Sequence, residues 1–205
     1  MSKCIVLTGG PGGGKTTLIE ELGRDPAWQG RFLALPEAIF VAGRVGISMR
    51  EQLFQRLMVE TQRGLEDALA RTLEPDDPRA ILCHRGTLDP LAYWLDRGWP
   101  EQTFFAYTGM AREDHYRRYA AVIHLVTAAD GAEAHYQRWP EAHRPESVEQ
   151  AIRLDRVLQR VWSDHPGYYC LDNAAKDWTI KSQAAREILG DLIFGNDTDG
   201  SLQDG

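Results

Sequence analysis

Features that would direct this chain to a membrane, a secreted fold or a nucleic acid polymer are scarce. The 205 residues contain only three cysteines, and no apolar run approaches the ~20 residues that span a bilayer. The net charge of −7 leaves no broad basic face for nucleic acid. We therefore expect a soluble, cytoplasmic protein with buried, reduced thiols at Cys4, Cys83 and Cys170.

Metal-site spacing, internal repeats and interdomain linkers are missing as well. The polar stretch 130–145 contains His135 and His143, but no cysteine or histidine pair has the spacing of a zinc site. Apolar residues make up 43% of the chain and charged residues 26%, as in ordinary globular proteins. We expect one domain over residues 1–194, followed by a flexible, acidic, glycine-rich tail over 195–205.

Short apolar runs alternate with helical patterns along the chain. The runs predict strands at Cys4–Thr8, Arg31–Leu35, Ala80–Cys83, Ala121–Val126 and Tyr168–Leu171. Helices are expected at 16–22, across 48–73 as one helix or two, from Asp89 as N-cap, at 111–119, from the capping box at Ser147, and at 179–194. The aromatic-rich stretch 98–109 stays unassigned. This order predicts an α/β fold, a five-stranded parallel sheet with helices on both faces.

The segment after the first strand carries the most specific motif. Gly9–Thr16 reads GGPGGGKT and matches G-x-x-x-x-G-K-[ST], the phosphate-binding P-loop. Its glycines bring backbone N–H groups close to phosphate oxygens, and the following helix N-terminus favours an anion. The predicted nucleotide-binding residues here are Gly10, Pro11, Gly12, Gly13, Gly14, Lys15, Thr16 and Thr17. Lys15 should reach the β- and γ-phosphates, and the Thr16 hydroxyl should bind Mg²⁺, which predicts Mg²⁺ with ATP, or with GTP.

Further motifs follow the later strands. They are Pro36-Glu37-Ala38, His84-Arg85-Gly86-Thr87-Leu88-Asp89, Arg144-Pro145-Glu146-Ser147 and, around the fifth strand, His165-Pro166 and Leu171-Asp172-Asn173. With the P-loop, they resemble a family of P-loop ATPases and kinases that includes the nicotinamide riboside kinase domain of bacterial NAD-biosynthesis regulators. A eukaryotic GTP- and phosphoinositide-binding protein belongs to the same family, and deoxynucleoside kinases are more distant. The resemblance covers roughly residues 3 to 193 and implies the three-layer sandwich of P-loop NTPases.

The resemblance also implies roles for individual side chains. Glu37 would accept the proton of an acceptor hydroxyl or orient it; it could instead hold a magnesium-bound water or be a solvated residue at a helix start. Arg85 would face phosphate or acceptor. Arg138 and Arg144 would belong to a lid around 130–147 that neutralises charge on the triphosphate. Asn173 would lie near the nucleotide base, although it could equally form a turn.

His84 is a departure from the family pattern, which has an acid at this position. A neutral imidazole brings no negative charge to a metal ion, so His84 could weaken metal binding, or could be a buried structural histidine. Asp89 also matches the family, but an N-cap role would explain it equally well.

Two functions of different classes follow. The first is a kinase that transfers the γ-phosphoryl group of Mg-ATP to a hydroxyl of a nucleoside-like or other small metabolite, with Lys15, Glu37, Arg85 and Arg144 as catalytic residues. The alternative is a nucleotide-binding switch or scaffold with slow hydrolysis that acts through a protein or lipid partner. An oligomeric ATPase machine fits poorly, since no acidic run follows a strand. The acceptor, the preferred nucleotide and the oligomeric state stay open.

Overall fold

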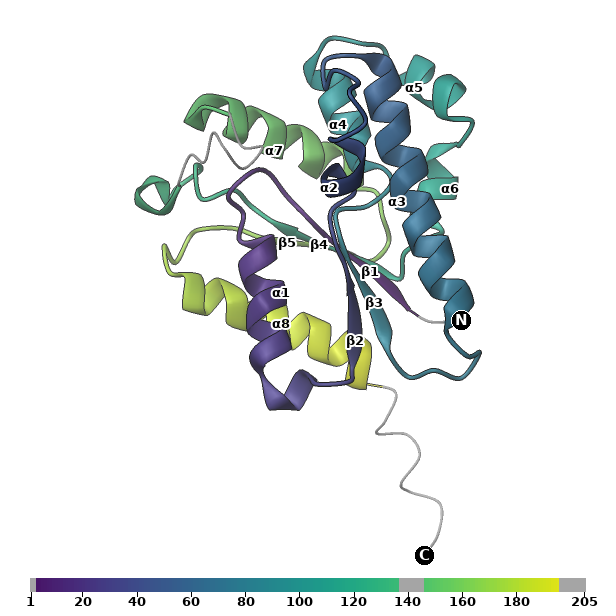
Figure 1. Ribbon diagram of the computed structural model, residues 1–205. Coiled ribbons are helices and arrows are strands. Elements are labelled where there is room, and N and C mark those ends of the chain that lie inside the picture. Colours follow the sequence, from purple (N-terminus) through teal and green to yellow (C-terminus); the bar gives the residue numbers. More distant parts are fainter. Residues whose placement is uncertain (1–2, 137–145, 196–205) are drawn as a thin grey trace, which may run out of the picture.

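Five apolar segments pair into one parallel sheet in the computed structural model, which describes residues 3–136 and 146–195. The strands are β1 (Cys4–Thr8), β2 (Phe32–Leu35), β3 (Ala80–His84), β4 (Ala121–Leu125) and β5 (Tyr168–Leu171). Their order across the sheet is β2-β3-β1-β4-β5, and every neighbouring pair is parallel. This confirms the predicted α/β fold (Figure 1).

Helices cover both faces of this sheet (Figure 1). The α-helices are α1 (Lys15–Arg24), α2 (Ile39–Ala42), α3 (Gln52–Thr72), α4 (Asp89–Asp96), α5 (Glu101–Thr108), α6 (Arg112–Tyr116), α7 (Val148–Trp162) and α8 (Trp178–Phe194). Two short 3-10 turns add η1 (Pro26–Trp28) and η2 (Glu133–His135). Helices α1 and α8 lie against one face, and α3, α4 and α7 lie against the other.

The central strand explains why the strands read as continuous apolar runs. Ile5 and Leu7 of β1 pack against Leu18 of α1 and Leu189 of α8, whereas Val6 packs in the core cluster on the opposite face. Successive side chains of a strand point to opposite faces, so a strand covered on both sides needs apolar residues throughout. The predicted burial of Cys4–Thr8 on both faces is therefore confirmed for its inner residues.

The register brings the carboxyl ends of the inner strands to one edge. Leu7 pairs with His84, Thr8 pairs with His124, and Leu35 pairs with Cys83. The P-loop and the segments after β2 and β3 therefore leave the sheet together, at the edge where ligands bind in open α/β sheets.

Some sequence-based expectations need correction. Residues 48–73 form one helix, α3, and the unassigned aromatic stretch contains α5, whose Phe104 is fully buried against Trp94 at 5.6 Å between ring centroids. The helix expected at 111–119 is shorter, α6. The prediction of three buried thiols is wrong, since only Cys83 is buried and Cys170 is exposed. Strand β5 lies at the edge of the sheet, and all four of its residues are at least partly exposed, unlike those of the inner strands. Cys170 is one of them.

None of the helices in residues 3–136 and 146–195 is both long enough and apolar enough to cross a bilayer.

The capping box of α7 generates a first test. The Ser147 hydroxyl accepts a hydrogen bond from the Gln150 N–H at 3.2 Å, and the Gln150 side chain accepts one from the Ser147 N–H at 2.9 Å. Ser147→Ala should lower the free energy of unfolding by about 1 kcal/mol, because the side-chain acceptor for a helix-end N–H is lost. The matched control Ser163→Ala, at the exposed C-terminal end of the same helix, should change it by less than about 0.5 kcal/mol. Equal effects of the two changes in urea unfolding would contradict the capping assignment.

Candidate functional site

The glycine-rich segment joins β1 directly to α1. Gly12 and Gly14 have φ angles of 76° and 91°, in the left-handed region that favours glycine. Gly14 is the N-cap of α1, and no side chain caps the helix there. The first N–H groups of α1 are thus left for an anion, at the positive end of the helix dipole.

Close packing against the neighbouring strand fixes the loop. A Cβ on Gly9 or Gly13 would lie 2.1 or 2.3 Å from the carbonyl oxygen of Leu125, at the end of β4. Aromatic rings cover other parts of the loop, because a Cβ on Gly12 would meet Tyr136 and one on Gly14 would meet Trp178. The backbone of the loop is therefore held in shape by its surroundings.

The Lys15 side chain is buried beneath its own loop. Its ammonium donates to the carbonyl oxygens of Gly9 at 2.7 Å and Gly10 at 3.0 Å. Neutral carbonyls are weaker partners for an ammonium than phosphate oxygens are, so a bound phosphate would compete for this group. The neighbouring Thr16 and Thr17 are exposed, and together with Lys15 they line a cavity that is described below.

Asp155 of α7 anchors the loop from the other side. One of its carboxylate oxygens accepts from the Gly10 N–H at 2.6 Å and from the Thr127 N–H at 3.0 Å. His124 lies 3.2 Å from the same carboxylate. Burial alone would raise the pKa of Asp155, but the hydrogen bond and charge of His124 and the Gly10 N–H outweigh it and lower the pKa. The carboxylate is therefore ionised at neutral pH.

On the opposite side, Arg85 connects three segments at the edge of the sheet. Its Nε donates to Glu37 at 2.6 Å, and its Nη1 donates to Asp89 at 3.2 Å and to the Gly9 carbonyl at 3.4 Å. Arg85 also has a φ of 74°, a left-handed conformation that costs a residue with a side chain roughly 1–2 kcal/mol. Such strain in a buried residue is typical of functional sites.

The N-cap role considered for Asp89 is wrong. Leu88 is the N-cap of α4, and Asp89 is its first helical residue with a buried carboxylate. That carboxylate accepts from the Thr8 hydroxyl at 2.9 Å and from the Trp162 indole at 2.7 Å, besides Arg85. The Asp89 carboxylate therefore accepts hydrogen bonds from three buried donors. An exposed helix cap would not have such partners.

His84 lies between the predicted metal ligand and the predicted acceptor residue. Its Nε2 is 3.1 Å from the Thr16 hydroxyl, and its Nδ1 is 3.5 Å from Glu37. The side chain is only 7% exposed. His84 is therefore a buried histidine that hydrogen-bonds to the P-loop threonine Thr16 and lies beside the Glu37 carboxylate.

The electrostatics around Glu37 favour its ionised form. Burial would raise its pKa, but the charges of Arg85, His84 and Lys15 lower the pKa below the ordinary value for a glutamate. Nearby, burial raises the pKa of Tyr93, so that its phenol stays protonated. Glu37 is thus an acceptor of hydrogen bonds and a weak base at neutral pH.

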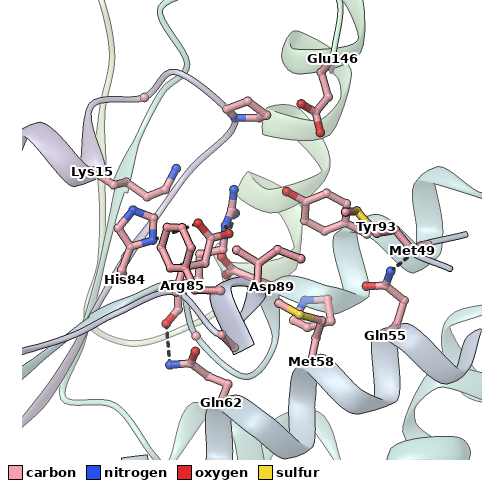
Figure 2. Close-up of a pocket in the computed structure, with 18 of the residues that line it drawn as sticks. Lys15, Met49, Gln55, Met58, Gln62, His84, Arg85, Asp89, Tyr93 and Glu146 are labelled. Carbon is pink, nitrogen blue, oxygen red and sulfur yellow. Dashed lines mark hydrogen bonds and ion pairs between the residues drawn. The ribbon is translucent and has the colours of Figure 1, made fainter. Parts of the chain in front are cut away.

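A cavity of about 340 Å³ connects these groups. Figure 2 shows Lys15 and His84 at one end, and Tyr93, Met49 and Gln55 at the other, with Met58 along one wall. Charged side chains cluster beside the P-loop, while thioethers and an aromatic ring line the far part. A space of this kind suits a ligand with a polar reacting end and a less polar body.

A second cavity, of about 320 Å³, lies against the P-loop and is lined by Asn173, Trp178 and Lys181. The Asn173 amide donates to the carbonyl oxygens of Thr127 and Asp130, both at 2.7 Å, and its oxygen accepts from Lys181 at 2.9 Å. Burial lowers the pKa of Lys181 to about 8. Asn173 is therefore in the cavity wall, and its amide holds the loop after β4 that contains Thr127 and Asp130.

The predicted lid arginines, Arg138 and Arg144, lie outside the described residues. The described ends of that segment approach each other, since the Tyr136 hydroxyl donates to the Glu146 carbonyl at 3.1 Å. No cluster of three or more histidine, cysteine or acidic side chains that could hold a metal occurs in the described ranges.

Sequence reasoning missed several residues of the site, most clearly Asp155 and Trp162. Both lie on the apolar stripe of α7, which also contains Ala151, Leu154 and Leu158. An acid on the buried face of an amphipathic helix is a signal that was available, because such a group needs buried donors. Its partners are not visible in the sequence.

The parallel sheet, the strand-to-helix glycine loop and its lysine define a P-loop nucleotide-binding domain. The chain belongs to the AAA domain family, whose model matches residues 4–179. This confirms the family resemblance inferred from the sequence motifs. No curated protein matches the sequence.

Two solved structures share the fold. Deoxyadenosine kinase from M. mycoides, with the products dCMP and a flexible dCDP bound, has a TM-score of 0.57 at 15% identity, over 91% of this chain and 98% of that one. The NadR protein in complex with NAD and AMP-PNP has a TM-score of 0.62 at 16% identity, over 95% of this chain and 50% of that one. The chain is thus an AAA-type P-loop domain with kinase structural neighbours.

The Asp155 anchor generates a second test. Asp155→Ala would leave the buried N–H groups of Gly10 and Thr127 without their acceptor, and should lower the free energy of unfolding by about 2–5 kcal/mol. The control Asp164→Ala, at an exposed position just beyond α7, should cost less than about 0.5 kcal/mol. Urea unfolding near neutral pH measures both, and a loss below 1 kcal/mol for Asp155→Ala, roughly one net hydrogen bond, would refute the anchor.

The same carboxylate gives a pH dependence. Because the folded-state pKa of Asp155 is lowered, its stabilisation is present above the ordinary aspartate value of about 4 and is lost as pH falls through the folded value. The stability difference between the wild type and Asp155→Asn should therefore shrink as pH is lowered from about 6 towards 3. A difference that grows over this range would contradict the lowered pKa.

Proposed function

We propose that this protein is a kinase that transfers the γ-phosphoryl group of ATP to a hydroxyl group of a small molecule. The observation that carries the proposal is the shared cavity: the P-loop residues Lys15 and Thr16 and the Glu37–Arg85 ion pair border one space. A protein that only binds or hydrolyses a nucleotide needs no room for a second small molecule beside the γ-phosphate position.

The loop residues fit a triphosphate, since the uncapped start of α1 and the Lys15 ammonium offer donors at the same place. Mg²⁺ would be held by the Thr16 hydroxyl together with phosphate oxygens, and it would neutralise charge on the transferring phosphoryl group. Glu37 is the acidic side chain beside His84, and it is the nearest candidate for supporting that ion.

Glu37 would orient the acceptor hydroxyl by accepting its hydrogen bond. Its lowered pKa makes it a weak base, but phosphoryl transfer passes through a loose transition state in which positioning matters more than early proton removal. Arg85 would hold Glu37 in place through the 2.6 Å ion pair. Its positive charge would offset the negative charge of Glu37 where the acceptor hydroxyl binds.

The remaining assignments stay predictions. Arg144, with Arg138, would neutralise developing charge from a lid around 130–147, and the wall of the second cavity near Asn173 would face the nucleotide base. GTP is the alternative donor.

One observation favours a second candidate, a nucleotide-dependent switch or scaffold. His84 lies 3.1 Å from the Thr16 hydroxyl, at the position where the family resemblance implies an acid, and a neutral imidazole brings no negative charge to a metal ion. Weak metal support would slow phosphoryl transfer while leaving nucleotide binding intact, and the output would then pass to a protein or lipid partner.

A coupled assay separates the two functions. The protein is incubated with Mg-ATP and a panel of nucleosides, sugars, hydroxy acids and vitamins, and ADP formation is compared with and without each compound. Acceptor-dependent ADP formation that is lost in Lys15→Ala supports the kinase. Retained nucleotide binding with no stimulation by any compound would favour the switch.

Glu37→Gln generates the third test. The change removes the negative charge that orients the acceptor hydroxyl, so kcat with a compound that stimulates ADP formation should fall by about 10²–10⁴-fold. The affinity for ATP without Mg²⁺, measured by calorimetry, should change by less than about threefold, because glutamine keeps an oxygen that can accept from Arg85 and Lys15 still donates to the Gly9 carbonyl. The exposed control Glu74→Gln should retain wild-type kcat. Loss of ATP affinity with unchanged kcat would assign Glu37 to the nucleotide instead.

His84→Asp generates the fourth test. An acid beside Thr16 adds a negative charge near the bound ion, so the Mg²⁺ concentration for half-maximal binding of a fluorescent ATP analogue should fall by about tenfold. His84→Asn, neutral and of similar size to aspartate, serves as the matched control and should show no such gain. An unchanged titration in His84→Asp would place His84 outside the reach of the metal.

A further inference from the structure

Two arginines line the cavity at the end that Met49 and Tyr93 mark in Figure 2. Arg50 directly follows Met49 in the turn before α3, and Arg97 lies one helical turn beyond Tyr93, at the C-cap of α4. Both side chains face the same space as Lys15 and Glu37 without belonging to the P-loop or to the Glu37–Arg85–Asp89 network. The reaction proposed above does not use them.

A hydrogen-bonded turn presents Arg50. The Arg50 N–H donates to the Ser48 hydroxyl at 3.2 Å, the Ser48 N–H donates to Glu51 at 3.1 Å, and the Gln55 amide donates to the Met49 carbonyl at 3.3 Å. The turn is thus fixed on both sides. Within residues 3–136 and 146–195, the Arg50 guanidinium makes no hydrogen bond or ion pair, so its donors remain available to a ligand.

Arg97 is held more tightly. Its Nη1 donates to the Tyr93 carbonyl at 2.9 Å, and its guanidinium lies 5.8 Å from the centre of the Trp99 ring. Partial burial is the largest cause of the lowered pKa of Arg97; the charge of Arg50 acts in the same direction, and Asp96 and Tyr93 oppose it. Two cations line this end of the cavity, in a chain whose net charge is −7.

Two of the three carboxylates that line the cavity, Glu37 and Asp89, form ion pairs with Arg85. The third, Glu146, has one buried oxygen with no hydrogen-bond partner among the described residues. In the part of the chain that the structure describes, none of the three forms an ion pair with Arg50 or Arg97. An anion bound at this end of the cavity would offset the positive charge of the two guanidiniums and would receive charge-assisted hydrogen bonds.

We infer that the phosphoryl acceptor carries a negatively charged group, a carboxylate or a phosphate, which Arg50 and Arg97 bind at the Met49–Tyr93 end of the cavity while the acceptor hydroxyl lies at Glu37. This inference rests on the proposed kinase function and narrows it to anionic hydroxyl compounds. The body of such a molecule would lie along Met58 and Tyr93, between the two polar ends.

Matched pairs of compounds test the inference. Each pair shares a hydroxyl and differs in an anionic group: orotidine against uridine and pantothenate against panthenol for the carboxylate, and uridine 3′-monophosphate against uridine and glycerol 3-phosphate against glycerol for the phosphate. ADP formation with Mg-ATP is measured for every member. The expected result is that an anionic member is accepted with kcat/KM at least tenfold above that of its neutral partner, and the pair concerned identifies the anion as carboxylate or phosphate.

Two variants assign the effect to the arginines. Arg50→Gln and Arg97→Gln should each raise KM for the accepted anionic compound by about 10- to 100-fold, with kcat within about threefold, since a charge-assisted contact common to ground and transition state is lost. Their Kd for ATP should stay at the wild-type value. Arg44→Gln, an exposed arginine of the same segment that does not line the cavity, is the matched control.

The outcomes are distinct. Preference for the neutral members, or a KM change below twofold in both variants, would overturn the inference and leave the kinase function standing. A rise in Kd for ATP in Arg50→Gln or Arg97→Gln would also overturn it, because the arginines would then serve the nucleotide. If no member of any pair stimulates ADP formation, the inference falls, and the wider panel described above decides separately whether the kinase function falls with it.

Discussion

The largely buried ion pair between Arg85 and Glu37 is the interaction on which the rest of the site depends. Arg85 follows β3, Glu37 follows β2, and the same guanidinium reaches Asp89 at the start of α4 and the Gly9 carbonyl in the P-loop. Removing one partner of a buried pair leaves an uncompensated charge, which typically costs about 3–5 kcal/mol. The strained backbone of Arg85 is tolerated because these contacts hold it.

Two buried acids, Asp155 and Asp89, hold the P-loop and the strand that precedes it. Asp155 holds the P-loop through the Gly10 N–H, while Asp89 holds the strand before it through Thr8. The loop therefore lies between two carboxylates, each supplied by a helix on the same face of the sheet. These contacts are made within the chain and hold the P-loop backbone; fixed donors of this kind are the condition for strong electrostatic stabilisation of a transition state.

The sequence predicted what is local or periodic, and missed what depends on distant contacts. The strands, the P-loop and the capping box at Ser147 are visible because short apolar runs and fixed motifs specify them. The α5 helix was missed because its Phe104 is ordered by packing against Trp94. Asp89 looked like an N-cap because its partners, Thr8 and Trp162, lie 81 and 73 residues away. Arg50 and Arg97 line the same cavity from segments far apart in the sequence, and no local motif marks either residue.

The fate of the γ-phosphate tests the central claim most directly. The protein is incubated with ATP labelled with ³²P at the γ-position, Mg²⁺ and a compound that stimulates ADP formation, and the products are separated by chromatography. The account predicts that the label appears on the organic compound in amounts equal to the ADP formed, and that Glu37→Gln suppresses this transfer. Label found only in inorganic phosphate would contradict it, because the cavity beside the P-loop would then admit water rather than an acceptor.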